Sequence, residues 1–220
     1  MEKINILMAT YNGEAFLEEQ VQSIIAQSFT DWRLLIHDDG STDNTVNILR
    51  RLMQKDNRIQ LLEDGISHMG VARNFIHLVT CTSAPYCMFC DQDDVWQPNK
   101  VEKMVHAIEQ CDPTIPQVLY TNSFLWSPER GIISDKNTLT YPTTLRQTLF
   151  LNTGIQGAAA IFNRAMCLEI KPLLPSNKEI VTAVNVINTP IVIAIPIIVI
   201  PLLRLILNFD LSIFSPYLLL

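Results

Sequence analysis

The sequence has 220 residues, of which 48% are apolar and 17% are charged. This balance is that of a globular protein with one sizeable core, and it excludes a chain that is disordered throughout. The formal net charge is −6, so the chain lacks the basic stripe of a general nucleic-acid-binding protein. We therefore expect no nucleic-acid partner.

Apolar runs typical of buried strands alternate with amphipathic segments typical of helices over the first 110 residues. In chain order, strands are expected at residues 4–8, 32–36, 59–62 and 86–90, and helices at about 17–25, 43–53, 71–79 and 98–108. Asp43 is the expected cap of the second helix, and Pro98 is expected to open the fourth. Four such units predict an α/β fold with a mostly parallel, Rossmann-like sheet and helices on both faces.

The second half of the sequence is less regular. A short helix is expected at residues 145–151 and a strand at 157–162. The composition then changes after Lys178, because the only basic residue beyond it is Arg204 and the only acids are Glu179 and Asp210. We therefore divide the chain into a domain of residues 1–178 and an apolar tail of residues 179–220.

The five cysteines indicate a reducing compartment. Their number is odd, and the N-terminal residues predict a strand rather than a secretory signal, so a cytoplasmic protein is the simplest interpretation. Cys87 and Cys90 form a C-x-x-C pair, but a zinc site would need a second pair, which the sequence lacks. Because both lie in an apolar run, we expect them to pack as small core residues.

Three polar loops follow predicted strands, at residues 10–13, 38–43 and 91–94. Ligands of parallel sheets bind beyond the carboxyl ends of the strands, so these loops are expected to line one edge. Residues i and i+2 of a strand point the same way, which would let Asp91 and Asp93 hold one Mg²⁺ or Mn²⁺ ion. Such an ion provides the counter-charge that a departing diphosphate needs.

Four motifs resemble those of family 2 glycosyltransferases, in order and at suitable separations. They are Ala9-Thr10-Tyr11-Asn12, Asp38-Asp39-Gly40-Ser41-Thr42-Asp43, Gly70-x-Ala72-Arg73-Asn74 and Asp91-Gln92-Asp93-Asp94-Val95-Trp96-x-Pro98-x-Lys100. The resemblance covers about residues 3–165 and implies a GT-A fold and an inverting, metal-dependent transferase. The last motif is most similar to rhamnosyltransferase-type members that build bacterial cell-surface polysaccharides.

The resemblance also implies roles for the matching residues. Those implied to bind the nucleotide are Thr10, Tyr11, Asn12, Asp39, Arg73 and Asp91. Asp39 would read the base, and Arg73 would hold the diphosphate or orient the acidic loop. Asp91 would approach the ribose and the metal, with Asp93 as the main metal ligand. The implied donor is dTDP-rhamnose or a UDP-sugar, and the acceptor is a saccharide or a lipid-linked molecule.

Other residues of the motifs and the four histidines carry weaker expectations. Asp94 is expected to support its loop. Trp96 has two open interpretations, a core aromatic residue or an acceptor contact. The histidines show no paired spacing, and we interpret them as structural or surface residues: His37, His68, His77 and His106.

An inverting transferase needs a general base that deprotonates the acceptor hydroxyl. The resemblance implies that this base lies soon after Pro175, and Glu179 is the only acid there before Asp210. Glu179 is therefore the candidate base of an acceptor half that we interpret as incomplete. We expect donor binding to be retained and transfer to be weak or absent.

The apolar tail has two open interpretations. Residues 190–203 are almost purely apolar, but they include three prolines and fall short of the roughly 20 residues of a spanning helix. The tail either associates with the inner face of the membrane or is an aberrant extension of the kind that a frameshift produces.

Three functions other than sugar transfer fit parts of the sequence. An aspartate-nucleophile phosphatase would use Asp91 as nucleophile, but its motif normally follows the first strand of the domain. A sugar nucleotidyltransferase would carry a glycine-rich loop in place of residues 10–13. A truncated relative that binds the nucleotide without turnover stays open.

Overall fold

The computed structural model describes residues 2–127, 130–134, 157–171 and 218–219. The expected helix at residues 145–151, the candidate base Glu179 and nearly all of the apolar tail lie outside the described residues. Within the described parts, no helix combines the length and the apolar character needed to cross a bilayer.

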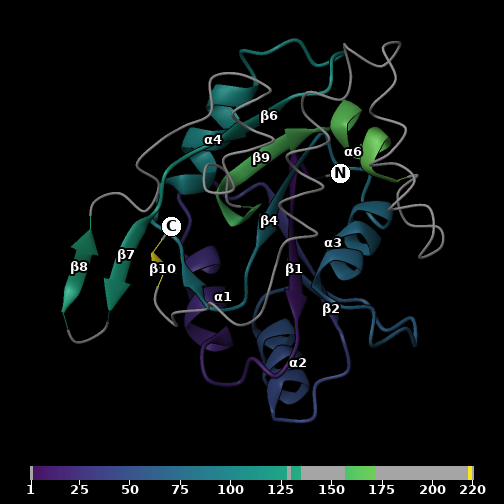
Figure 1. The fold of residues 1–220 in the computed structure, drawn as a ribbon, viewed down its shortest axis with the longest axis vertical. Coiled ribbons are helices and arrows are strands. Elements are labelled where there is room, and N and C mark those ends of the chain that lie inside the picture. Colours follow the sequence, from purple (N-terminus) through teal and green to yellow (C-terminus); the bar gives the residue numbers. More distant parts are fainter. Residues whose placement is uncertain (1, 128–129, 135–156, 172–217, 220) are drawn as a thin grey trace, which may run out of the picture.

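A six-stranded sheet forms the centre of the fold, in the order β3-β2-β1-β4-β9-β6 (Figure 1). Its strands are β1 (Ile4–Thr10), β2 (Trp32–Asp38), β3 (Ile59–Leu61), β4 (Tyr86–Cys90), β6 (Val118–Tyr120) and β9 (Ala160–Asn163). The first four strands pair in parallel, whereas β9 runs antiparallel to both of its neighbours. The predicted mostly parallel sheet is confirmed.

Helices cover both faces of this sheet, as predicted. One core contains α1 (Leu17–Ile25), α2 (Thr45–Lys55) and α4 (Lys100–Ile108), and the other contains α3 (Val71–Thr80) and α6 (Arg164–Ile170). Side chains alternate along each strand, so Ile6 of β1 enters the first core and Leu7 enters the second. Cys87 and Cys90 are both fully buried, one in each core, which confirms that they pack as core residues. Because they face opposite sides of the sheet, they cannot share a metal ion.

Several element boundaries differ from the prediction because of contacts with distant residues. β1 and β2 each run two residues further than expected, since Thr10 pairs with Asp38 and donates its hydroxyl to that carboxylate. α4 begins at Lys100 and not at Pro98, whose carbonyl accepts a hydrogen bond from the amide of Ser28 instead of starting the helix.

Two further expectations about element starts were wrong in detail. Asn44, and not Asp43, stands at the N-cap of α2, although an Asp43 oxygen still accepts a hydrogen bond from the Thr45 amide at 3.0 Å. Residues 157–159 form a 3-10 turn, and only then does β9 begin. The carbonyl of Ala159 in this turn accepts a hydrogen bond from the Thr121 amide, which ties the turn to the end of β6.

A second, smaller sheet lies beside the first, in the order β5-β10-β7-β8. It consists of β5 (Asp94–Val95), β7 (Phe124–Ser127), β8 (Gly131–Ser134) and β10 (Leu218–Leu219). β7 and β8 form an antiparallel hairpin that projects from the body of the protein in Figure 1. Residues 218–219 pair with β5 on one side and β7 on the other, next to the acidic turn that follows β4.

Arg58 and Asp56 form an ion pair just before β3, and it packs against the buried Trp32. Arg58 donates to both oxygens of Asp56, and its guanidinium lies 3.7 Å from the centroid of the Trp32 ring. The hydrogen bond from Arg58 lowers the pKa of Asp56 below its ordinary value.

Replacing Asp56 by asparagine is expected to lower the free energy of unfolding by about 1 kcal/mol at neutral pH. Because the folded-state pKa is depressed, this stabilisation is present above the unfolded-state pKa of about 3.9 and is lost as the pH falls through the folded-state value. Urea unfolding of both proteins at about pH 7 and about pH 3.5 measures the difference. A difference of equal size at both pH values would contradict this assignment.

Candidate functional site

The three polar loops meet at one edge of the sheet, as the sequence predicts. Gln92, in the loop after β4, pairs with the backbone of Tyr11 in the loop after β1. The Tyr11 amide donates to Oε1 of Gln92 at 3.0 Å, and Nε2 of Gln92 donates to the Tyr11 carbonyl at 3.1 Å. Gly13 makes room for this contact, because a Cβ there would lie 2.3 Å from Oε1 of Gln92. The first and third loops are thus joined directly.

Asn12 joins the loop after β1 to the loop after β2. Its amide donates to the Ser41 hydroxyl, and its Oδ1 accepts from the Thr42 amide, both at 2.8 Å. Its φ of 48° lies in the left-handed region, which asparagine tolerates better than most residues. Asn12 therefore organises the edge, and its predicted contact with a nucleotide would have to use atoms that these bonds leave free.

Asp38, at the end of β2, holds its own loop together. Its two oxygens accept hydrogen bonds of 2.6–3.2 Å from the Thr10 and Ser41 hydroxyls and from the Gly40 and Ser41 amides. Thr10 is 1% exposed, and its hydroxyl is committed to this carboxylate. Thr10 therefore shapes the edge through Asp38, whereas the side chain of Tyr11 is half exposed and free to line a pocket.

Asp39 connects β2 to the loop before α3. One of its oxygens accepts from the Met69 amide at 2.7 Å and the other from the Gly70 amide at 2.8 Å. The residue is 8% exposed, so little of it faces solvent. Each carboxylate oxygen has a second lone pair, and recognition of a base by Asp39 stays a prediction.

Arg73 lies in the first turn of α3, three residues after Gly70. Its side chain makes no hydrogen bond or ion pair with the residues that the structure describes. Both predicted roles, contact with a diphosphate and orientation of the acidic loop, stay predictions.

Asp91 and Asp93 lie in the turn after β4, since this strand ends at Cys90. The expectation that strand alternation aligns them was therefore wrong, and the turn brings them together instead. Burial, followed by the nearby charge of Asp93, raises the pKa of Asp91 to about 7, against the opposing effect of Lys100. Burial also raises the pKa of Asp93. A divalent cation would stabilise the charged forms of these two buried carboxylates.

Lys100 and Asp94 are both buried near this turn, where the charge of each acts on the pKa of the other, and the sequence assigned them no joint role. They are 7% and 4% exposed. Nζ of Lys100 donates to the Ala158 carbonyl at 2.6 Å and lies 4.0 Å from the centroid of the Trp96 ring. Burial lowers the pKa of Lys100 to about 8, and burial together with Asp91 raises that of Asp94 well above its ordinary value. Within the described parts, Oδ2 of Asp94 has no hydrogen-bond partner.

One sequence signal could have revealed Lys100. A cation in the first turn of a helix opposes the helix dipole, so a lysine at the start of α4 indicates a local acidic partner.

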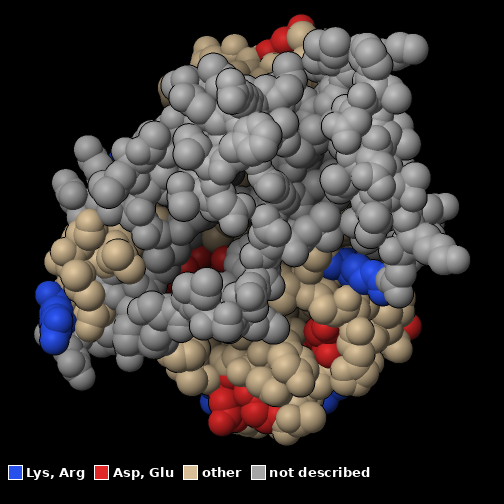
Figure 2. Space-filling model, viewed as in Figure 1, with Lys and Arg blue, Asp and Glu red and all other residues tan. Residues whose placement is uncertain are grey.

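Trp96 is 3% exposed and packs in the core with α1 and α4, which confirms the core interpretation of that residue. Figure 2 shows acidic side chains of the described residues near the middle of the face that it draws.

A family model described as "Glycosyl transferase family 2" matches residues 5–170. The chain belongs to glycosyl transferase family 2. Among its relatives is the dTDP-rhamnosyl transferase RfbG of Shigella flexneri, 38% identical over 105 residues, which cover 46% of this chain and 36% of RfbG.

Two solved structures of other proteins have the same fold as this chain. TarS 1–349 of S. aureus in complex with UDP-GlcNAc superposes with a TM-score of 0.57 at 22% identity, covering 76% of this chain and 47% of TarS. The mannosyltransferase PcManGT of Pyrobaculum calidifontis, in complex with GDP-Man and Mn²⁺, gives 0.55 at 17% identity, covering 77% and 46%. The predicted GT-A fold is confirmed. This chain spans less than half the length of each of these three proteins.

Proposed function

We propose that the chain binds a nucleoside-diphosphate sugar together with Mg²⁺ or Mn²⁺, and that the protein transfers the sugar, with inversion, to a saccharide or lipid-linked acceptor. The observation that supports this is the joining of three polar loops, one of which is the acidic turn, at one edge of the sheet. The similarity to RfbG supports dTDP-rhamnose as donor and cell-surface polysaccharide synthesis as the process, with a UDP-sugar as the alternative donor. The comparisons do not favour the phosphatase or the nucleotidyltransferase.

The residues present fit a divalent cation. Burial raises the pKa of Asp91 and of Asp93, so their charged forms are costly without a cation, and Oδ2 of Asp94 has no hydrogen-bond partner among the described residues. Asp91 and Asp93 would hold the cation through hard oxygen ligands, which suit Mg²⁺ and Mn²⁺. The bound ion would offset the charge on the diphosphate as the sugar departs. Arg73 would add a second positive charge from the other side of the edge.

Calorimetry with UDP and dTDP, with and without Mg²⁺ or Mn²⁺, tests the donor site. We expect binding of a nucleoside diphosphate that depends on the metal. Metal-independent binding would exclude the role of the acidic turn, and binding of neither nucleotide would exclude the function. Release of phosphate from a monoester, lost on Asp91→Asn, would favour the phosphatase.

Transfer itself is predicted to be weaker than donor binding. The donor residues lie in the matched part of the chain, whereas the candidate base Glu179 lies beyond residues 5–170. A paired assay on one preparation measures nucleotide-sugar binding and sugar transfer to a saccharide or lipid-linked acceptor. We expect clear binding and little transfer. Robust transfer would contradict this, and its loss on Glu179→Gln would identify the base.

Association of residues 179–220 with the inner face of the membrane stays a prediction. The observation behind it is the apolar stretch at residues 190–203. Fractionation of the expressed chain checks it, because recovery of the protein entirely as a monomer in the supernatant would exclude it.

A further inference from the structure

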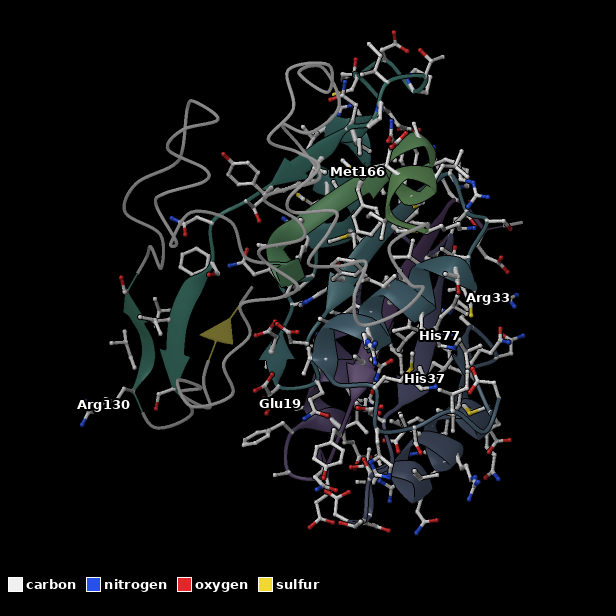
Figure 3. All side chains as sticks on the ribbon, turned by 45° about the vertical axis from the view of Figure 1, so that its right-hand side comes forward. Glu19, Arg33, His37, His77, Arg130 and Met166 are labelled. Atoms are coloured by element: carbon white, nitrogen blue, oxygen red, sulfur yellow. The ribbon has the colours of Figure 1, made fainter. Side chains whose placement is uncertain are left out.

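Two histidines and one acid come together away from the acidic turn. His37 is the last residue but one of β2, His77 lies in α3, and Asp64 lies in the loop between β3 and α3. Figure 3 shows the two histidine side chains next to each other, and their ring centroids are 4.9 Å apart. One nitrogen of each histidine and an oxygen of Asp64 all lie within 4.8 Å of one another. The sequence shows no paired spacing of these histidines, and their meeting comes from the fold; both are buried, in keeping with the interpretation of the histidines as structural or surface residues.

The side chain of Asn74 determines which nitrogen of His37 carries the proton. Nδ2 of Asn74 donates to the His37 carbonyl at 3.2 Å, which turns Oδ1 of Asn74 toward Nδ1 of His37 at 2.9 Å. Because an amide oxygen only accepts, Nδ1 of His37 is the protonated nitrogen. In the neutral ring, Nε2 of His37 then presents a lone pair.

That lone pair faces a carboxylate. Nε2 of His37 is 3.3 Å from Oδ1 of Asp64, and Nε2 of His77 is 2.6 Å from Oδ2 of the same carboxylate. His37 is 1% exposed, so water does not separate these groups freely. A bare nitrogen and a carboxylate oxygen repel each other unless a proton or a metal cation lies between them. The arrangement therefore brings together three groups that can each offer an electron pair to a metal ion once their shared protons leave.

We propose that His37, Asp64 and His77 bind a zinc-class transition-metal ion at a site separate from the acidic turn. Ligands about 2.0–2.1 Å from a tetrahedral zinc ion lie about 3.3 Å apart, which is the separation of His37 and Asp64. Nε2 of His77 and Oδ2 of Asp64 are 2.6 Å apart, which is a hydrogen-bond length, so this pair would open by about 0.7 Å when the ion replaces the shared proton. The hydrogen bond from Nδ1 of His37 to Asn74 is the outer contact that orients metal-binding histidines in other proteins. Imidazole ligands favour zinc over Mg²⁺ or Mn²⁺, so the two sites would take different ions.

The side chains around the cluster leave a place for a fourth ligand. Sγ of Cys81, at the end of α3, is 3.9 Å from Nε2 of His77, and this cysteine is exposed. The Asp64 side chain is 32% exposed, so the ion could enter from that side. A thiol or a water molecule would complete four-coordination, as in structural zinc sites.

Such an ion would fasten the loop that supports Asp39. Asp64 lies near the start of this loop, and the amides of Met69 and Gly70 near its end hold the Asp39 carboxylate. His37 is only two residues before Asp39 in the chain. The ion would therefore hold β2, the loop and α3 as one unit. Its effect on nucleotide affinity rests on the proposed function, whereas the metal binding itself does not.

Cobalt titration of the chelator-treated chain tests the proposal, because tetrahedral Co²⁺ reports its ligands through visible absorption. We expect one equivalent of tetrahedral Co²⁺ that Zn²⁺ displaces and excess Mg²⁺ does not. Asp64→Asn and His77→Gln should each weaken binding by at least about 100-fold. His106→Gln, on the distant helix α4, is the matched control and should bind normally. Asp93→Asn should also bind normally, which separates this site from the acidic turn.

The absence of tetrahedral Co²⁺ binding to the unchanged chain would overturn the proposal, whether or not the variants fold. Binding that is lost in Asp93→Asn but kept in Asp64→Asn would overturn it as well, because the ion would then belong to the acidic turn. Asp64 is exposed, so its variant is expected to fold even if the buried His77 variant does not. Failure of nucleotide binding with normal Co²⁺ binding would leave this site standing and exclude the proposed function instead.

Discussion

Replacing Lys100 by methionine is expected to lower the free energy of unfolding by about 1–3 kcal/mol. The substitution keeps the length of the side chain but removes the donor to the buried Ala158 carbonyl, together with the positive charge that acts to lower the pKa of Asp94. A buried carbonyl that loses its donor keeps its desolvation cost, which exceeds the net contribution of the hydrogen bond itself. Urea unfolding followed by circular dichroism measures the change.

Two further variants give this prediction its controls. Lys103 lies on the same helix and is exposed, so Lys103→Met should change stability by no more than about 0.5 kcal/mol. The double variant Lys100→Met with Asp94→Asn should be no less stable than Lys100→Met, because an asparagine at position 94 does not need the positive charge of Lys100. Equal stabilities of the Lys100→Met and Lys103→Met proteins would refute the stabilising role of Lys100.

Replacing Asp93 by asparagine is expected to weaken metal-dependent nucleotide binding by about 100-fold, the upper end of what is lost when a metal ligand's supporting contacts are removed. Stability should be unchanged or slightly higher, because the charge of Asp93 raises the pKa of Asp91 and so costs free energy in the metal-free protein. Calorimetry with Mn²⁺ and a nucleoside diphosphate gives the affinity, and thermal unfolding without metal gives the stability.

Asp31→Asn is the matched control for this substitution. Asp31 is an exposed acid immediately before β2, at the opposite edge of the sheet, so the same change of charge occurs away from the acidic turn. Its variant should bind like the unchanged chain. Equal losses in both variants would show that net charge, and not ligation by Asp93, determines the affinity.

Sequence periodicity predicted the four strand–helix units because buried strands and amphipathic helices have distinct spacings of apolar residues. Boundaries were predicted less well, since they depend on partners far away in the chain. Pro98 does not open α4 because its carbonyl is bonded to Ser28, seventy residues earlier. Thr10 extends β1 because Asp38 of the neighbouring strand accepts a hydrogen bond from its hydroxyl.

The parts of the candidate site that lie in sequence motifs were predicted. Contacts between residues far apart in the chain were not predicted. The acidic turn and the loop of Asp38 and Asp39 were found from their residue types at strand ends. By contrast, the meeting of His37 with His77 has no sequence spacing to reveal it, because β2 and α3 are brought together only by the packed sheet. The bonds from Met69 and Gly70 to Asp39 depend in the same way on a loop path that local propensities do not determine.

The contact between Gly13 and Gln92 couples two positions that are 79 residues apart in the chain. A side chain at position 13 would occupy the place of the Gln92 amide, while a shorter residue at position 92 would leave the backbone of Tyr11 without its two hydrogen bonds. A substitution at either position alone would therefore disrupt the contact between the loop after β1 and the loop after β4. Natural variation in the family should show the two changing together, and a designer who alters the donor pocket at one must redesign the other.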